Sequence, residues 1–471
     1  RLKGLDIYPW VFSAYLLAST VTTPLYGKLS DRIGRKRMLL FGLGLFSLGS
    51  ILSGCAQSMP QLIAMRVVQG LGAGALGPIV VTMIGDLYTL HERGKVQGLF
   101  SGVWGAASLL GPALGGELTD QLSWRAVFFV TVPVSLIAAW ILFRHVDERI
   151  QAARRQPVDW LGSALLAGSS TALLLAVLGE GGRPTLANAW WLGLALVLGA
   201  FLWVQEKRAA DPVLSLELIS RPTVAASIAG SFLIGALLFG VDTYIPLYVQ
   251  GVLGGSARQA GRMITPLFLA WSISVAVAAK LLVRLGFRRT GVIGSLLTAA
   301  GAAAVAVGSL NPAWASLCLP VGMIVIGLGM GPAALCFTVD VQNSVAWAQR
   351  GVATSIVMFS RTIGGALGVG ILGASLFFAL SHRLAAAGAT DIDVAAALRP
   401  ETHAKLSTSQ LRLVQRALGG SLGAVFVQMA ALAALGTFCS SRLSGGRISK
   451  PNEGALEELE KGGVPVVASE L

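Results

Sequence analysis

The stretch Gly27-Lys28-Leu29-Ser30-Asp31-Arg32-Ile33-Gly34-Arg35-Lys36-Arg37 joins two long apolar segments, and a related stretch follows much later in the chain. The second copy reads Ala279-Lys280-Leu281-Leu282-Val283-Arg284-Leu285-Gly286-Phe287-Arg288-Arg289, with Lys, Leu, Arg, Gly and a basic pair at matching places. A second match pairs Gly70-Leu71-Gly72-Ala73-Gly74 with Gly327-Leu328-Gly329-Met330-Gly331. Such self-similarity is the signature of an internal repeat. The sequence therefore predicts two related halves.

The composition places these halves in a membrane. The 471 residues are 54% hydrophobic and 13% charged, and the mean hydropathy is +0.71. Soluble domains carry about 25% charged residues, and disordered chains have low hydrophobicity. An ordinary soluble enzyme and a disordered chain are therefore excluded, and the sequence predicts an all-α polytopic membrane protein.

About 20 apolar residues are needed to cross the hydrocarbon core as a helix. Thirteen stretches of the chain meet this requirement, at 9–27, 38–56, 60–85, 96–118, 125–145, 159–179, 187–205, 223–250, 258–283, 291–309, 313–338, 351–380 and 419–440. The stretches 159–179 and 187–205 have no counterpart in the repeat. They predict a two-helix insertion between two bundles of six helices related by a pseudo-twofold axis along the membrane normal.

The basic residues predict the orientation of the spans. The segments that alternate on one side carry 22 of the 36 Lys and Arg residues, so that side is expected to be cytoplasmic. The same rule accounts for the net charge of +13 without nucleic acid. Thirteen spans with a cytoplasmic C-terminus would place residue 1 outside, which favours a first helix missing from this chain and fourteen spans in total. The expected divisions are an N-terminal bundle at 1–146, a linker with the inserted helices at 147–222, a C-terminal bundle at 223–440 and a cytoplasmic tail at 441–471.

The quoted stretch carries the chemistry expected of a gate. Gly27 permits close approach of helices, Gly34 permits a tight turn, and Asp31 can cap a helix N-terminus or pair with arginine. Its cations can also bind anionic lipid. The stretch resembles the signature loop between helices 2 and 3 of the major facilitator superfamily. The second copy has Val283 where the first has Asp31. The residues predicted to form this gate loop are Gly27, Asp31, Arg32, Gly34, Arg35 and Lys36.

Arg66 lies inside the span 60–85, with Gln69 one turn further along. A charge within a span costs about 2.5–3.5 kcal/mol on insertion scales. One interpretation is that Arg66 reaches to the extracytoplasmic interface, because it is near that end of the span. The pattern also resembles the arginine motif of helix 4 in the superfamily, and that resemblance implies a role in proton coupling.

The stretch Ala107-Ser108-Leu109-Leu110-Gly111-Pro112-Ala113-Leu114-Gly115-Gly116 resembles the helix-5 motif of the antiporter branches. Pro112 would bend the helix, and small residues would let neighbouring helices pack closely. General packing of small residues is the alternative explanation. The motif residues of this hypothesis are Gly111, Pro112, Gly115 and Gly116.

Two more charges lie inside predicted spans of the second half. Asp242 precedes Pro246 and can carry a proton or attract a cationic substrate, or it can make a structural hydrogen bond near the outer interface. Arg361 can lie in a central cavity, pair across the halves, or form a salt bridge within its own bundle. The region around Arg361 resembles helix 11 of fourteen-helix drug:proton antiporters.

The resemblance implies a multidrug efflux transporter that exports amphipathic or cationic drugs from a bacterial cytoplasm by proton antiport and alternating access. Export of one endogenous metabolite, lipid or siderophore is an alternative, and a transporter-like sensor or assembly subunit is a weaker one. The expected partners are small amphipathic molecules, protons and membrane lipid, in a monomer of the inner membrane; a periplasmic adaptor stays open. No metal, cofactor or enzyme activity is expected, because no nucleophile–base pair, phosphate loop or Cys/His ligand spacing is present.

Overall fold

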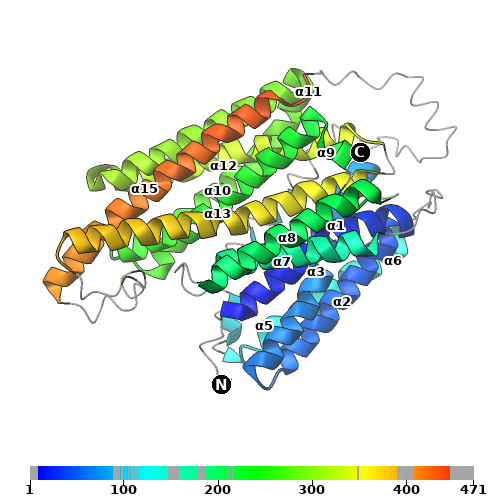
Figure 1. Cartoon of the computed structure of the whole chain (residues 1–471), viewed down its shortest axis with the longest axis horizontal. Helices are drawn as coiled ribbons and strands as arrows, with labels where there is room; N and C mark the ends of the chain where they lie inside the picture. Colours follow the sequence, from blue (N-terminus) through cyan, green and yellow to red (C-terminus); the bar gives the residue numbers. More distant parts are fainter. Residues whose placement is uncertain are drawn as a thin grey trace.

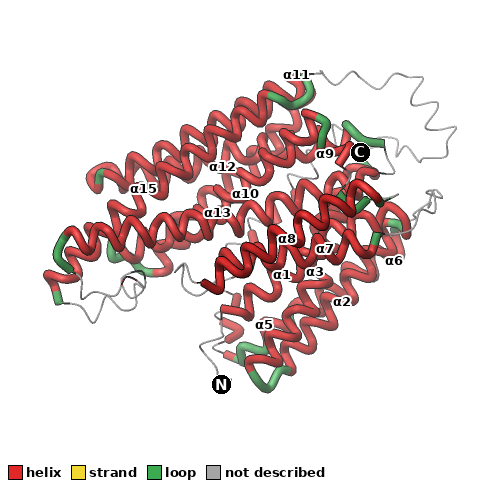
Figure 2. The backbone as a smooth tube through the Cα atoms, viewed as in Figure 1, coloured by secondary structure: helices red, strands yellow, loops and turns green. Residues whose placement is uncertain are grey.

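The computed structural model describes residues 9–88, 121–146, 159–178, 186–209, 212–214, 216–346, 349–389 and 407–445, and isolated positions within 96–119 and at 394 and 398. Its described residues form helices and short connections, without a strand (Figure 2). The helices are α1 (Pro9–Ile33), α2 (Arg35–Cys55), α3 (Met59–Leu87), α5 (Ala126–Phe129), α6 (Thr131–His145), α7 (Trp160–Leu178), α8 (Leu186–Arg208), α9 (Leu216–Ile219), α10 (Pro222–Gly251), α11 (Ala257–Leu310), α12 (Pro312–Asn343), α13 (Arg350–Ala386) and α15 (Thr408–Ser441).

Ten helices in the described part of the chain are long and apolar enough to cross a membrane. They match predicted spans, and α11 contains two of these in one run. The predicted span 9–27 lies in α1, which has a more polar composition and is not among the ten. The predicted span 96–118 is described only at scattered positions. The chain is therefore an all-helical, multi-pass membrane protein.

The two copies of the repeated stretch share one turn. Gly34 has φ 108° and separates α1 from α2, and Gly286 has φ 81° and kinks α11 between its two spans. Only glycine adopts such angles without strain. The connections between the predicted spans, at 28–37 and 284–290, were expected to be loops. That prediction is wrong apart from the turn itself, because helix continues on both sides of each glycine. A positive φ at one glycine is enough to reverse the chain.

The helices gather into two groups with the inserted pair between them (Figure 1). One group contains α1, α2, α3, α5 and α6, and the other contains α10 to α13 and α15. The largest apolar core lies in the second group, around Tyr248, Phe337 and Phe426. The inserted α7 and α8 pack on each other, and α7 contacts both α1 and α13, where Leu174 meets Ile363. The exact domain boundaries stay predictions.

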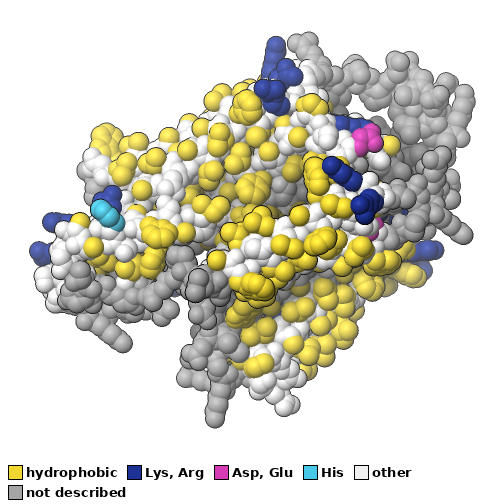
Figure 3. All heavy atoms as spheres, viewed as in Figure 1, with side chains coloured by type: hydrophobic (Ala, Val, Ile, Leu, Met, Phe, Trp, Pro, Cys, Tyr) yellow, Lys and Arg dark blue, Asp and Glu magenta, His cyan; other side chains and the backbone are white. Residues whose placement is uncertain are grey.

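Large apolar side chains cover the outer surface, whereas Lys and Arg gather toward the ends of the helices in the view of Figure 3. Trp140 and Phe143 of α6 are 63% and 68% exposed, and Trp190 of α8 is 71% exposed. An apolar patch this continuous marks a surface that meets lipid rather than water. Beyond α15, Leu443 is fully buried and Ser444 bonds to Asp340, so the described start of the predicted tail is docked on the second group.

Candidate functional site: the junction between the two halves

Asp31, near the end of α1, caps the N-terminus of α13. The backbone N–H groups of Gly351 and Val352 donate to its two carboxylate oxygens at 3.0 and 2.8 Å. The first N–H groups of a helix have no partner within that helix, and they form the positive end of its dipole. The residue that precedes α13, Gln349, gives no side-chain cap. The first half of the chain therefore supplies the cap for a helix of the second half.

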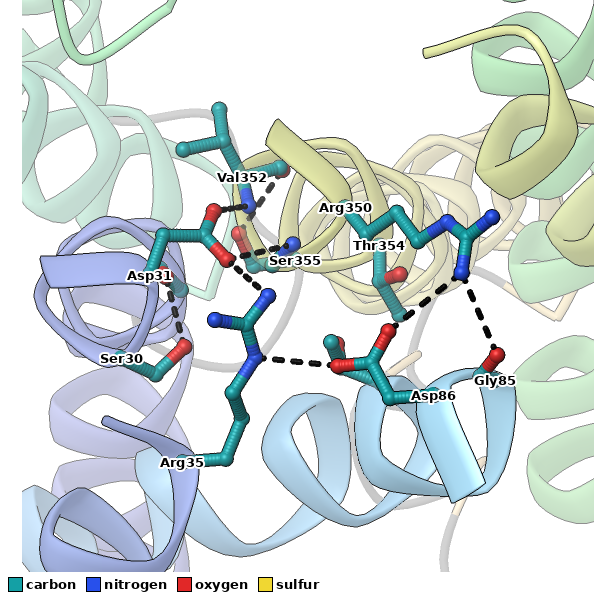
Figure 4. A network of polar contacts seen from close by, with 12 residues as sticks. Ser30, Asp31, Arg35, Gly85, Asp86, Arg350, Val352, Thr354 and Ser355 are labelled. Carbon is teal, nitrogen blue, oxygen red and sulfur yellow. Dashed lines mark hydrogen bonds and ion pairs between the residues drawn. The ribbon is translucent and has the colours of Figure 1, made fainter. Parts of the chain in front are cut away.

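A line of ion pairs extends from Asp31 across the junction (Figure 4). The guanidinium of Arg35 lies 2.8 Å from Asp31 and 3.0 Å from the carboxylate of Asp86. Asp86, at the end of α3, is in turn 3.5 Å from Arg350 of α13. The Asp31 and Arg35 side chains are only 5% and 4% exposed. Each buried charge thus has an opposite charge beside it, as burial requires.

Arg350 and Gln342 fasten the same junction from the second half. Arg350 donates to the carbonyl of Gly85 at 3.4 Å and to that of Gln342 at 3.3 Å. The amide of Gln342 donates to the carbonyl of Val81 at 3.4 Å and to the hydroxyl of Thr354 at 3.0 Å. The ends of α1 and α3 are therefore bonded to the ends of α12 and α13.

Burial changes the protonation chemistry of Asp31, which lies beyond the predicted span 9–27. Loss of water raises the pKa of its carboxyl to about 7. Arg35 and the two N–H groups of α13 act in the opposite direction, because they stabilise the charged form. Asp86 adds to the rise as a second negative charge. The junction therefore contains a carboxyl group that can exchange a proton near neutral pH.

The other predicted gate residues have different positions. A Cβ built on Gly27 would lie 2.7 Å from the carbonyl oxygen of Gly351 and would also collide with Ser355, so α1 and α13 touch at this glycine. Lys36 bonds within the first half, where it donates to the carbonyl of Phe143 of α6 at 2.8 Å. Arg32 is half-buried and has no carboxylate partner among the described residues.

The helices that meet at this junction diverge toward their other ends. In Figure 1 the N-terminal end of α1 and the C-terminal end of α13 are far apart, whereas their opposite ends lie together. The connections between the halves that are described above all belong to the end with Asp31. The structure is therefore closed at that end of the molecule.

Arg66 is held inside the first half. Its guanidinium lies 4.1 Å above the ring of Tyr15, donates to the carbonyl of Val11 at 3.0 Å, and bonds to Gln69. Gln69 in turn donates to Ser50 at 2.6 Å. Arg66 thus contacts α1 through both ring and backbone, and Gln69 continues the polar chain to α2. Gln69, which lies one turn after Arg66 in the sequence, is thus a hydrogen-bond partner of Arg66 in the fold.

No hydrogen bond or ion pair joins Asp242 to Arg361 among the described residues. Asp242 lies on an exposed part of α10 without a hydrogen bond or ion pair to a described residue. Arg361 is half-buried, and among the described residues its guanidinium makes a long 3.5 Å contact with Thr338. Its Nε has no partner in the described part of the chain. An intrabundle salt bridge at Arg361 is therefore not formed there.

The glycine motif is only partly visible. Pro112 and Gly116 lie outside the described residues. Gly111 is an exposed and Gly115 a half-buried helical position, and a Cβ built on either has nothing within 4 Å among the described atoms. The role of this motif stays a prediction.

The sequence from residue 4 to residue 369 matches the profile of the Major Facilitator Superfamily. The chain belongs to the Major Facilitator Superfamily. It is accordingly a transporter of small molecules and not an enzyme. No cluster of three or more His, Cys, Asp or Glu side chains that could hold a metal ion occurs in the described residues.

Relatives of this superfamily member include named drug transporters. It is 34% identical over 375 residues to Multidrug resistance protein 3 of Bacillus subtilis, covering 79% of this chain and 73% of that protein. It is also 34% identical over 379 residues to the multidrug transporter protein MdtP of the same organism, covering 79% and 69%. Efflux pump dotC of Dothistroma septosporum is 29% identical over 449 residues, covering 92% and 77%.

Solved superfamily structures share the fold. The human organic anion transporter MFSD10 aligns with a TM-score of 0.62 at 16% identity, covering 92% of this chain and 83% of that one. The proton:xylose symporter XylE aligns with a TM-score of 0.57 at 16% identity, covering 90% and 84%.

The two copies of the repeated stretch share a turn at glycine but make different contacts with the rest of the chain. The first copy binds α13 through Asp31, whereas in the second copy Arg288 donates to the carbonyl of Leu443 at 3.1 Å, beyond the end of α15. Val283, at the place of Asp31, is an exposed apolar side chain and cannot form such a cap. Asp86 and Arg350 were not predicted as gate residues. Their sequence signal was an acid at the end of one predicted span and an arginine at the start of another, on the side predicted to be cytoplasmic.

Proposed function

We propose that the chain is a proton-driven antiporter that exports amphipathic or cationic small molecules from the cytoplasm by alternating access. The observation that carries this proposal is the charged junction around Asp31, which closes one end of a molecule whose other end diverges. The multidrug transporters among the relatives support the substrate class. The basic residues near the closed end support a cytoplasmic location for it.

Alternating access needs two states and a ligand that distinguishes between them. The junction supplies contacts that exist only when the cytoplasmic end is closed. Asp242 and Arg361 supply ionisable groups within spans that have no ion-pair partner among the described residues. A proton or a cationic substrate that binds Asp242 would therefore compete for the same charge. Arg66 would transmit changes between α1 and α3 through Tyr15.

The expected setting is the inner membrane of a bacterium, with the C-terminus in the cytoplasm and the chain working as a monomer. The proton gradient is the expected energy source, without a cofactor. Two measurements distinguish a proton-driven drug antiporter from a dedicated exporter and from a sensor or assembly subunit. They are the transport of a dye and the dependence of that transport on the proton gradient.

The experiment measures ethidium efflux from cells that express the chain, with and without an uncoupler that collapses the proton gradient. We expect efflux that stops with the uncoupler. Asp242→Asn should abolish efflux, because the amide keeps the size of the side chain but cannot bind a proton or offer a charge.

Glu217→Gln is the matched control, because Glu217 is an exposed acid whose side chain is 88% accessible. Equal gradient-driven efflux by Asp242→Asn and the parent would show that Asp242 has no coupling role. Export of an endogenous metabolite, lipid or siderophore without dye transport would favour a dedicated exporter. Absence of any transport by a folded chain would favour a sensor or assembly subunit.

A further inference from the structure

A second group of buried charges lies where the inserted helices meet α1. Lys28 of α1, Asp159 just before α7 and Glu206 in the last turn of α8 are 3%, 9% and 4% exposed. Lys28 lies three residues before Asp31, one helical turn away on the same helix. The gate network described above uses none of these three side chains.

Each side chain of this group makes one or more bonds. The ammonium of Lys28 donates to the carbonyl of Pro212 at 2.8 Å, and the N–H of Leu214 donates to Glu206 at 3.0 Å. One oxygen of Asp159 accepts from the N–H of Gly162 at 2.8 Å and from the amide of Gln205 at 2.9 Å. Residues 212–214, which follow α8, are thus held between α1 and the inserted helices.

One carboxylate oxygen of Asp159 and one of Glu206 accept no hydrogen bond from a described residue. Asp159 Oδ2 and Glu206 Oε1 are buried without a hydrogen-bond partner among the described residues. A Cβ built on Gly162 would collide with Asp159 Oδ2 and lie 3.2 Å from Glu206 Oε1. The two oxygens therefore converge on the space beside a glycine. An ionised carboxylate only accepts hydrogen bonds, whereas a protonated one can donate to its neighbour.

The charge balance favours a single proton at this place. The charged side chains that act on Glu206 are Asp159 and Lys28. Phe359 of α13 packs against the apolar cluster that contains Leu166 and Leu202 of the inserted helices. Two buried carboxylates close together resist ionising at the same time. One retained proton leaves one negative charge, which the ammonium of Lys28 neutralises.

We propose that Asp159 and Glu206 share one proton and, with Lys28, form a proton-binding site that ties the inserted helices to the cytoplasmic gate. When α1 leaves α13, Lys28 moves with Asp31 and withdraws its positive charge from the acids. The site then takes up a further proton from the cytoplasm, because its charged form has lost its partner. Proton uptake and gate opening are thereby linked at a site separate from Asp242 and from the ion pairs of Asp31.

The test measures the distance between the gate and the inserted helices as a function of pH. Spin labels are placed at Ile33→Cys and Arg208→Cys, both exposed positions, in the full-length protein with its four cysteines replaced. We expect a pH-dependent distance change in the parent. Glu206→Gln should abolish this change, and Lys28→Met should move its midpoint upward by about 1–3 pH units, as loss of a neighbouring opposite charge does.

Three controls make the outcome specific. Glu217→Gln removes an exposed acid and should leave the midpoint unchanged, and Asp31→Asn should leave this transition in place although it alters the gate. Lys28→Arg should restore the parental midpoint. If Glu206→Gln does not fold, Asp159→Asn should abolish the same change. A parental pH profile in Lys28→Met, or in whichever of the two acid variants folds, would overturn the proposal. The measurement uses neither substrate nor gradient, so its failure is distinct from failure of the antiport proposal.

Discussion

At the residue scale, Asp31 combines two roles that are usually separate. It neutralises Arg35 within its own half, and it caps α13 of the other half. Breaking a buried ion pair costs about 3–5 kcal/mol when the partner is left alone. Arg35 also contacts Asp86, so loss of Asp31 weakens the network without leaving Arg35 unpaired.

Asp31→Asn should therefore reduce ethidium efflux about tenfold or more while expression stays normal. The amide can still accept one N–H of α13, but it cannot gain or release a proton, so the balance between the closed and open states no longer responds to protonation at this position. Initial efflux rates, normalised to the amount of protein in the membrane, give the result. Unchanged efflux would remove Asp31 from the gate.

The raised pKa of Asp31 predicts how the gate responds to pH. Burial raises the pKa to about 7 from its ordinary value of 3.8, so the closed gate binds a proton that the open gate releases to water. This contribution to closure is complete below pH 3.8 and is lost as pH rises through about 7. In Glu206→Gln, which removes the second and opposing proton site, the distance between labels at Ile33→Cys and Ser220→Cys should therefore shorten on acidification. Asp31→Asn should flatten this response, and lengthening on acidification would contradict the assignment.

At the scale of the elements, α1 and α13 can approach because position 27 is glycine. The backbone of Gly351 lies where a side chain at 27 would begin. Closely packed small residues are a general means of helix association in membranes, because lipid removes the hydrophobic drive between helices. The gate therefore depends on shape as well as on charge.

Gly27→Val should open the gate, because overpacking costs about 1–3 kcal/mol and shifts the equilibrium about 5- to 150-fold. Gly44→Val in α2 is the matched control, since a Cβ at Gly44 meets nothing within 4 Å among the described atoms. The label pair at positions 33 and 220 reports the result. A closed distance in Gly27→Val equal to that of Gly44→Val would show that contact at Gly27 does not limit closure.

At the scale of the whole molecule, four helices from two halves are joined at one end by Asp31, Asp86, Gln342 and Arg350. This polar joint is small relative to the apolar cores on either side. A joint of a few charge-assisted bonds can open without disturbing those cores. Two bundles can rock against each other only if the contacts between them are weaker than the packing within each bundle.

Arg350→Gln should shift the molecule toward the open-gate state by about tenfold, because charge-assisted bonds to Asp86 and two backbone carbonyls are lost. The fraction of short distances between the labels at 33 and 220 measures this shift. Arg37→Gln is the control, because Arg37 is exposed on α2 at the same end of the molecule. An equal effect of both variants would mean that net charge, and not the Arg350 contacts, controls the gate.

Much of this architecture could be predicted from local sequence. A window of about 20 apolar residues partitions into lipid whatever the rest of the chain does, and Lys and Arg orient it. The repeated glycines at 34 and 286 likewise predict turns, since positive φ is a property of one residue. Asp31 could be proposed as a cap or an ion-pair partner from its type and its place at a span end.

The partners of these residues could not be read in the same way. Asp31 meets the backbone of Gly351, 320 residues away, and Arg350 meets Asp86 across 264 residues. The sequence places Asp86 at the end of a predicted span but does not indicate that Arg350 is its partner. Lys28 likewise meets Pro212 only because α7 and α8 pack beside α1. Lipid partitioning and turn geometry are local properties of the chain, whereas the gate and the carboxylate pair exist only where separate helices are packed together and water is excluded.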